Sequence, residues 1–243
     1  MLRPTGLFVT GTDTGVGKTA AAVAIIRQLV SEGVGVGVYK PVASGTVATD
    51  PGGDPARLHA AAGGRRPLDE VCPQIFASPC APSDAARAEG RRVDERLLRT
   101  GIERCRDGND FVVVEGAGGL CSPLGDQTLV ADLARVFGYP LVLVDDVRLG
   151  SIGRTLATLH AARALGLAVA AVVLSEVIRP ADPPVVPPAA AHPARIAAAG
   201  VAFLARTVRP LPVLRLGHGA AAIEPSFDWL AGCRARADGP AAL

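Results

Sequence analysis

Aromatic residues are scarce in this sequence, and its charge is neither large nor clustered. Phe, Trp and Tyr make up 4% of the 243 residues, and the formal net charge is only +2. The densest basic groups are the pairs Arg65-Arg66 and Arg91-Arg92, which are typical of a solvated surface. Because nucleic acids and anionic membranes attract concentrated positive charge, neither is an expected partner.

The cysteines indicate neither a disulfide framework nor a zinc site. They are odd in number and none has Cys-x-x-Cys spacing. The five are Cys72, Cys80, Cys105, Cys121 and Cys233. No apolar run reaches the length of a membrane span, and the N-terminal residues lack the pattern of a secretory signal. We therefore expect a protein of a reducing compartment, the cytoplasm.

The apolar content comes from small and branched side chains, which suit a parallel sheet covered on both faces. Hydrophobic residues make up 49% of the chain. The length fits one α/β domain over residues 1–243, with a Pro-rich surface excursion at 180–193.

Apolar spacing alternates along the chain between that of strands and that of helices. Expected strands cover Gly6–Thr10, Val34–Tyr39, Phe111–Val114, Leu141–Val144 and Val169–Leu174. Expected helices cover Lys18–Val30, a short stretch within 47–64, Val93–Cys105, Leu129–Phe137 and Thr155–Leu165. This order predicts an α/β fold of the P-loop NTPase type, a doubly wound, mostly parallel sheet with helices on both faces. Such sheets bind ligands at the carboxyl ends of their strands.

Residues 11–19 read Gly-Thr-Asp-Thr-Gly-Val-Gly-Lys-Thr and separate the first expected strand from the first expected helix. A phosphate-binding loop occupies this position, because backbone N–H groups and the helix N-terminus then point at anionic oxygens. The first Gly lies one residue further from the Gly-Lys-Thr core than in the standard pattern. The core chemistry is unaffected: Lys18 can neutralise phosphate charge, and Thr19 can hold Mg²⁺.

Charged side chains follow two other expected strands. Lys40 ends the second strand, within the sequence Tyr-Lys-Pro-Val-Ala-Ser-Gly at 39–45, and Glu115 ends the third, followed by Gly-Ala-Gly-Gly. An acidic residue at a strand end is the expected second magnesium ligand of a P-loop fold. Asp54, beside two glycines, is a further candidate.

Together these segments resemble the dethiobiotin synthetase family. The resemblance rests on residues 9–14 with 16–19, on 39–45, on 114–119, and on Pro123-Leu124 with Ala131-Asp132, in the family's order and spacing. It covers roughly residues 5 to 178 and includes the unusual loop length. It implies a homodimeric enzyme that joins CO₂ to one amine of 7,8-diaminononanoate, phosphorylates the carbamate with ATP, and closes a ureido ring.

The resemblance also assigns roles to positions of this sequence. It implies that Lys40, Lys18 and Thr14 are catalytic, that Mg²⁺ is held by Thr19, Asp54 and Glu115, and that substrate is held by Ser44, Gly118, Gly150 and Ser151. The implied nucleotide-binding residues are Gly15, Val16, Gly17, Lys18, Thr19, Ala20, Asp54, Glu115, Gly116, Ala117, Gly118, Ser175 and Glu176. The four histidines (His59, His160, His192 and His218) are scattered, and we expect each to be structural or exposed.

Three segments depart from the family pattern. Gly153 and Arg154 replace an Asn-His pair, so Arg154 could pair with the substrate carboxylate, or the tail site could accept a different acid. Ser175 and Glu176 replace an Asn-Asp pair whose Asn reads the adenine edge, and residues 215–218 replace a Gly-x-Ile-Pro segment of the base site. The Pro-rich segment lacks the aromatic that a partner subunit usually supplies. We predict that triphosphate and magnesium binding persist with a relaxed or altered base preference.

Two other functions stay open from the sequence. One is a related P-loop ligase acting on a different diamine or amino acid, which Gly153 and Arg154 suggest. The other is a regulatory or partitioning P-loop ATPase. Those proteins usually carry a second Lys early in the phosphate loop, where this chain has Asp13, so this class is disfavoured.

Overall fold

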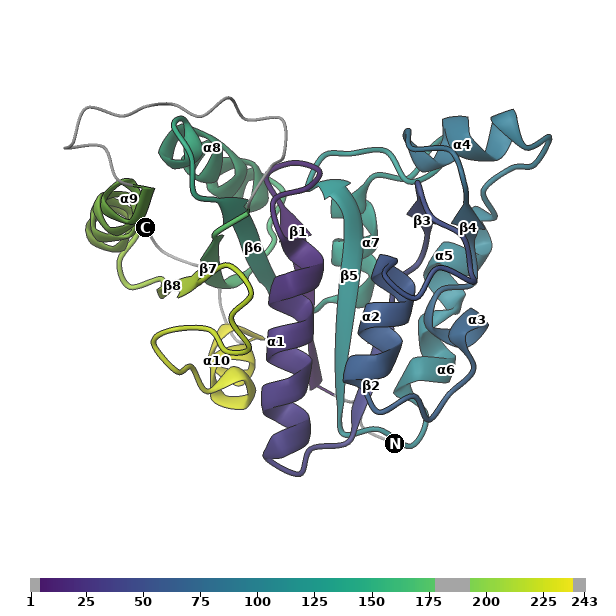
Figure 1. Ribbon diagram of the computed structural model, residues 1–243, viewed down its shortest axis with the longest axis horizontal. Coiled ribbons are helices and arrows are strands. Elements are labelled where there is room, and N and C mark those ends of the chain that lie inside the picture. The colour runs from purple at the N-terminus through teal and green to yellow at the C-terminus, as the bar shows by residue number, and fades with distance from the viewer. Residues whose placement is uncertain (1–4, 178–192, 238–243) are drawn as a thin grey trace.

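A parallel sheet runs through the middle of the protein in the computed structural model, which describes residues 5–177 and 193–237 (Figure 1). Its strands, in spatial order, are β2 (Val36–Tyr39), β5 (Phe111–Gly119), β1 (Thr5–Gly11), β6 (Leu141–Asp146), β7 (Val169–Ser175) and β8 (Val213–Leu216). All neighbouring strands are parallel, so their carboxyl ends share one edge. A separate parallel pair consists of β3 (Ala43–Ser44) and β4 (Ile75–Phe76).

Helices cover both faces of the sheet, which confirms the predicted doubly wound fold. In Figure 1, α1 crosses the front of the sheet and α7 lies behind it. The face of α1 also carries α2 and α10; these helices span Lys18–Ser31, Asp54–Ala61 and Trp229–Ala237. The opposite face carries α5 (Glu95–Thr100), α6 (Ile102–Arg106), α7 (Val130–Phe137), α8 (Ser151–Ala164) and α9 (Pro193–Thr207). The short helices α3 (Leu68–Val71) and α4 (Pro82–Ala88) pack beside β2 and on β3–β4 respectively.

Alternation along the strands divides the core into two layers. In the central strand β1, Leu7 and Val9 pack in the layer that contains α1, whereas Phe8 packs in the layer that contains α7. All three are fully buried. Since successive side chains of a strand point to opposite faces, a run of apolar residues satisfies both layers at once.

The structure corrects several boundaries. The single helix expected over Val93–Cys105 is two helices, α5 and α6, separated at Gly101. A Cβ at Gly101 would lie 2.5 Å from the Tyr39 hydroxyl oxygen, so close packing there admits only glycine. The helix expected from Thr155 begins one turn earlier, after Gly150, whose left-handed backbone (φ 92°) starts α8.

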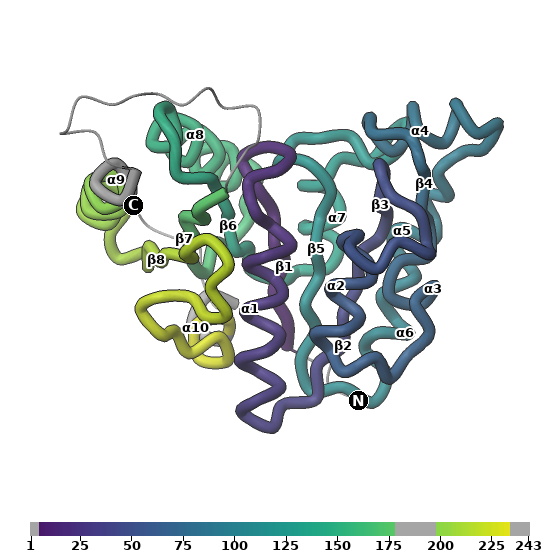
Figure 2. Tube along the Cα trace, viewed as in Figure 1, coloured from purple at the N-terminus to yellow at the C-terminus, as the bar shows by residue number. Residues whose placement is uncertain are grey.

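Three elements after residue 178, α9, β8 and α10, were not predicted from the sequence. Figure 2 shows the segment between β8 and α10 passing beside α1. The Pro-rich excursion expected at 180–193 lies outside the described residues except for Pro193, which begins α9. Among the helices of the described residues, none combines the length and apolar content that crossing a bilayer needs.

Candidate active site

The phosphate loop connects β1 to α1, as predicted. Gly15 and Gly17 have left-handed backbone conformations, with φ of 71° and 93°. A Cβ at Gly17 would lie 2.4 Å from the Ser175 hydroxyl, so this position has room only for hydrogen. Gly17 also starts α1 without a side-chain cap, and the first N–H groups of the helix are left for a ligand.

Lys18 and Lys40 are the only lysines in the sequence, where every other basic residue except histidine is arginine. Both line the same cavity, Lys18 from the first turn of α1 and Lys40 from the residue after β2. The Lys18 ammonium donates to the backbone carbonyl of Asp13 (2.8 Å). Burial lowers the pKa of Lys18 to about 8 even though Glu115 opposes the shift. The structure therefore concentrates both compact, point-like ammonium charges in one place.

A cluster of charged side chains surrounds the buried Lys40 ammonium, and the Asp54 side chain in it is half-exposed. Its Nζ lies 2.5 Å from Glu115 Oε1 and 3.4 Å from Asp54 Oδ2, and the Thr19 hydroxyl donates to the same Glu115 oxygen (2.9 Å). Burial disfavours the Lys40 ammonium, yet the two carboxylates raise its pKa. Burial likewise disfavours the Asp54 carboxylate, but Lys40 and Thr19 hold its pKa below the usual value. The sequence predicted that Lys40 and Glu115 lie at one sheet edge, and the structure brings them into contact with each other and with Thr19 and Asp54.

The oxygen atoms of this cluster fit Mg²⁺. Thr19 supplies a hydroxyl, and Asp54 and Glu115 supply carboxylates, the hard donors that this ion prefers. Glu115 Oε2 is buried and has no hydrogen-bond partner in the described part of the chain, so it has a lone pair to offer. Within residues 5–177 and 193–237, no three His, Cys, Asp or Glu side chains form a metal-binding group. Mg²⁺ commonly takes one or two carboxylates and completes its shell with water and phosphate oxygens.

The cavity has a volume of about 1070 Å³ and extends from the phosphate loop in two directions. Most of the predicted site residues line it: Thr14, Gly15, Gly17, Lys18, Thr19, Ala20, Lys40, Ser44, Asp54, Ala117, Gly118, Ser175 and Glu176. Arg27, Arg57, Cys80 and Ser122 also line it, and the sequence analysis did not single them out. They come from helices and loops that converge only in the folded chain.

The remaining predicted residues do not line the cavity. Val16 is fully buried with its side chain in the core, and Glu115 lies beneath Lys40. A Cβ at Gly116 would approach Val130 Cγ1 to 3.0 Å, so this glycine permits the packing of α7. Gly150 and Ser151 begin α8 at the same edge of the sheet.

One end of the cavity is formed by Ser175, Glu176 and the loop after β8. Arg215 donates from Nε to Glu176 Oε1 (2.9 Å) and also pairs with it through Nη2. The backbone N–H of His218 approaches Oε2 (3.4 Å). Hydrogen bonds from Arg215 lower the pKa of Glu176, so this carboxylate is ionised and accepts hydrogen bonds only. His218 is exposed, as expected, but it also lines the cavity.

The other end is formed by Ser44, Gly118 and the β3–β4 pair. The Ser44 hydroxyl donates to the Cys80 carbonyl (2.7 Å), and Gly118 has φ of 74°. A Cβ at Gly118 would lie 2.5 Å from the Ser122 hydroxyl and 3.8 Å from that of Thr14. Small residues therefore keep this end open next to Thr14.

Curated relatives cover most of the chain. The sequence matches a family described as an AAA domain over residues 5–213. It is 44% identical over 191 residues to a protein of Anaeromyxobacter dehalogenans named ATP-dependent dethiobiotin synthetase BioD, and the match covers 79% of this chain and 85% of that one. A protein of the same name from Anaeromyxobacter sp. strain Fw109-5 is 39% identical over 213 residues, covering 88% and 90%. One from Bacillus licheniformis is 40% identical over 170 residues, covering 70% and 72%.

Solved structures share the fold at much lower identity. The signal recognition particle receptor FtsY from Elizabethkingia anophelis has a TM-score of 0.51 and 17% sequence identity. The match covers 88% of this chain and 59% of that one, so this chain spans less than two thirds of that structure. The likeness concerns the P-loop fold alone.

Proposed function

The chain belongs to the ATP-dependent dethiobiotin synthetase family, and we propose that it carboxylates 7,8-diaminononanoate and closes the product into a ureido ring with ATP. The observation that carries the proposal is that Lys18 and Lys40, together with Thr19, meet around one cavity at the end of the phosphate loop. The alternatives of a partitioning ATPase or a ligase for another substrate are not favoured by relatives that share this name over most of their length.

The reaction needs positioned charge more than a protein nucleophile. One amine forms a bond to the carbon of CO₂ and loses a proton, giving a carbamate. A carbamate oxygen then attacks the γ-phosphorus, and the bond to ADP breaks. The second amine attacks the carbamoyl carbon, phosphate leaves, and a proton is released as the ring closes. Each step moves negative charge between oxygens, and Lys18 and Lys40 both line the cavity in which these oxygens would lie.

Lys18 would exchange its hydrogen bond to the Asp13 carbonyl for oxygens of the transferring phosphoryl group. Phosphate charge would stabilise the ammonium, whose pKa burial has lowered to about 8. Lys40, held by Glu115 and Asp54, would face the carbamate, with Thr14 and Ser44 beside it and Gly118 leaving space. Gly150 and Ser151 would help to position the substrate through their backbone.

We propose Mg²⁺ as the cofactor, held by Thr19, Asp54 and Glu115. When bound, it would neutralise charge on the β- and γ-phosphoryl oxygens. The same proposal covers CO₂ or bicarbonate as the carbon source, a homodimeric assembly and a cytoplasmic location.

ATP is the co-substrate of the family, and we propose that the base site of this chain is less selective than that of its relatives. Ser175 lacks the amide of the family's Asn, and Glu176 already pairs with Arg215. Phosphate release with ATP, CTP and GTP would test this, because the proposal expects kcat/KM values within about tenfold of one another. A strong preference for ATP would contradict it.

The reaction itself is tested by phosphate release that depends on both bicarbonate and diaminononanoate. Lys40→Ala should abolish the release while nucleotide binding is retained, since Lys40 is proposed to face the carbamate. Retained binding also shows that the variant is folded. Absence of release from the native chain with both substrates would disprove the function.

A further inference from the structure

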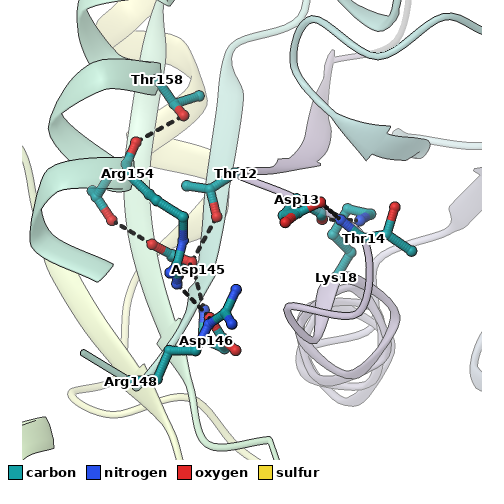
Figure 3. A network of polar contacts seen from close by, with 10 residues as sticks. Thr12, Asp13, Thr14, Lys18, Asp145, Asp146, Arg148, Arg154 and Thr158 are labelled. Atoms are coloured by element: carbon teal, nitrogen blue, oxygen red, sulfur yellow. Dashed lines mark hydrogen bonds and ion pairs between the residues drawn. The ribbon is translucent and has the colours of Figure 1, made fainter. Parts of the chain in front are cut away.

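A second polar cluster lies at the carboxyl end of β6, beside the phosphate loop (Figure 3). Its centre is the fully buried carboxylate of Asp145. Oδ1 of Asp145 accepts hydrogen bonds from the Thr12 hydroxyl (2.6 Å), from Arg154 Nη2 (2.8 Å) and from the backbone N–H of Asp146 (2.9 Å). Oδ2 accepts one from the Thr155 hydroxyl (3.1 Å). One carboxylate therefore joins groups from three segments.

These segments carry the two sides of the proposed active site. Thr12 is the first residue of the phosphate loop, and its backbone N–H also donates to the Val144 carbonyl on β6 (3.0 Å). Arg154 lies in the first turn of α8, three residues after Ser151. Asp145 thus connects the loop that binds nucleotide to the helix start assigned to the substrate.

The cluster holds the Arg154 guanidinium through Nη2, whereas Nε is buried and has no hydrogen-bond partner within the described residues. Its Nη2 contacts both Asp145 Oδ1 (2.8 Å) and Asp146 Oδ1 (2.5 Å), and only 26% of its side chain is exposed. Arg148 Nε pairs with the same Asp146 oxygen (3.0 Å), and among the described residues Arg154, not Arg148, pairs with Asp145. Arg154 is the cation that pairs with Asp145, and removing it would leave this buried carboxylate without its counter-charge.

We propose that Asp145 and Arg154 are positioning residues that hold the phosphate loop against the first turn of α8. In this arrangement Arg154 acts on the nucleotide site through Asp145 and Thr12, and it does not bind the substrate carboxylate. Two experiments test this proposal. The first, the nucleotide arm, measures ATP binding alone. The second, the substrate arm, measures turnover of the diamine and therefore rests on the proposed function.

The nucleotide arm measures the Kd of ATP with Mg²⁺ by calorimetry on the full chain without diamine. Arg154→Met and Thr12→Val should each weaken binding about fivefold, and the double variant should be no weaker than the worse single variant, because both changes break one connected network. Thr12→Ser keeps the hydroxyl and should bind ATP like the native chain. Arg148→Met removes an equal charge that does not reach Asp145, and should also leave the Kd unchanged. Unchanged Kd values for Arg154→Met and Thr12→Val would overturn the proposal, even if their melting temperatures fell.

The substrate arm compares diaminononanoate with its neutral methyl ester in the phosphate-release assay. Arg154→Met should lower kcat/KM by the same factor for both, because a positioning residue does not contact the carboxylate. A loss confined to the acid would show that Arg154 binds the carboxylate, and the proposal would be wrong.

If the native chain releases no phosphate with either compound, the proposed function fails, but the nucleotide arm still decides the role of Arg154. If Arg154→Met does not fold, the role of the network is decided by comparing the ATP Kd of Thr12→Val with that of Thr12→Ser.

Discussion

The two lysines of the cavity are both buried but differ in ionisation because their partners differ. Lys40 is paired with two carboxylates, which raise its pKa, whereas Lys18 donates to a backbone carbonyl and has its pKa lowered to about 8 by burial. Lys40 therefore keeps its charge throughout the physiological range. Lys18 is a side chain of this cavity whose charge changes just above neutral pH.

The affinity for ATP should depend on pH through Lys18. The ammonium form is present below a pKa of about 8 and is lost above it, so the Kd should be flat near neutral pH and then rise by up to about tenfold for each pH unit. Calorimetric titration between pH 6.5 and 9.5 measures this directly. Lys18→Arg keeps its charge over the whole range and should abolish the dependence, whatever its absolute affinity. A native Kd that stays flat to pH 9.5 would rule out this role for Lys18.

Removing the Lys40 ammonium should destabilise the protein strongly. Lys40→Met would leave the Glu115 carboxylate buried without its counter-charge, at a cost of about 3 kcal/mol in the free energy of unfolding. Urea denaturation measures this cost. The double variant Lys40→Met/Glu115→Gln should recover at least half of it, because a neutral amide replaces the unpaired charge. Lys18→Met, which removes an ammonium bonded to a carbonyl, is the matched control and should cost less.

At the scale of elements, glycines decide how closely neighbouring segments approach. A Cβ at Gly37 on β2 would lie 1.9 Å from the Cys105 carbonyl oxygen of α6, whereas one at Gly153 on α8 would have nothing within 4 Å. Gly37→Ala should therefore separate β2 from α6 and cost about 3 kcal/mol or more. Gly153→Ala should stabilise by about 0.5–1 kcal/mol, because alanine favours the helix. Urea denaturation of both variants should give opposite signs, and equal effects would show that the close approach at Gly37 is not structurally important.

The strands and the phosphate loop were predictable because their signals are local. Apolar runs predict β1 and β5 as buried strands. The Gly-Lys-Thr core at the start of α1 predicts a phosphate-binding loop. The break between α5 and α6 depends on the distance from Gly101 to Tyr39, which no local pattern encodes. The ion pair between Arg154 and Asp145 was not predicted either, because the sequence suggested that Arg154 pairs with a substrate carboxylate. Adjacent acidic residues at Asp145 and Asp146, directly after a strand, were the signal available for it.

Of the elements after β7, which the sequence did not predict, β8 was missed because it is short. Strand β8 has four residues, Val213–Leu216, and joins the sheet by pairing with β7. It nevertheless carries Arg215, which pairs with Glu176 at one end of the cavity. Tertiary context, more than β-propensity, decides the state of such a segment.

At the scale of the whole molecule, the sheet separates and joins the two core layers. Helix α10, which follows β7 in the chain, packs in the same layer as the first helix, α1. The only tryptophan, Trp229 of α10, is buried beneath α1, where its Nε1 donates to Gln28 Oε1 (3.0 Å) and its ring lies 4.8 Å from that of Phe227. A residue near the C-terminal end of the described chain therefore reports on contacts with the first helix. These contacts join the two ends of the described chain, and that residues 1–243 form one domain stays a prediction.

A single domain should unfold in one cooperative transition. The urea midpoint seen by Trp229 fluorescence should coincide with that seen by far-UV circular dichroism, which reports on all helices. ATP with Mg²⁺ should raise both midpoints together, because ligand binding to the native state stabilises every element that unfolds with the site. Trp229→Phe, with a buried ring of similar shape, should retain the circular dichroism transition and confirm the source of the fluorescence signal. Two separate midpoints, or an ATP shift confined to circular dichroism, would mean that α10 and its neighbours unfold independently of the nucleotide site.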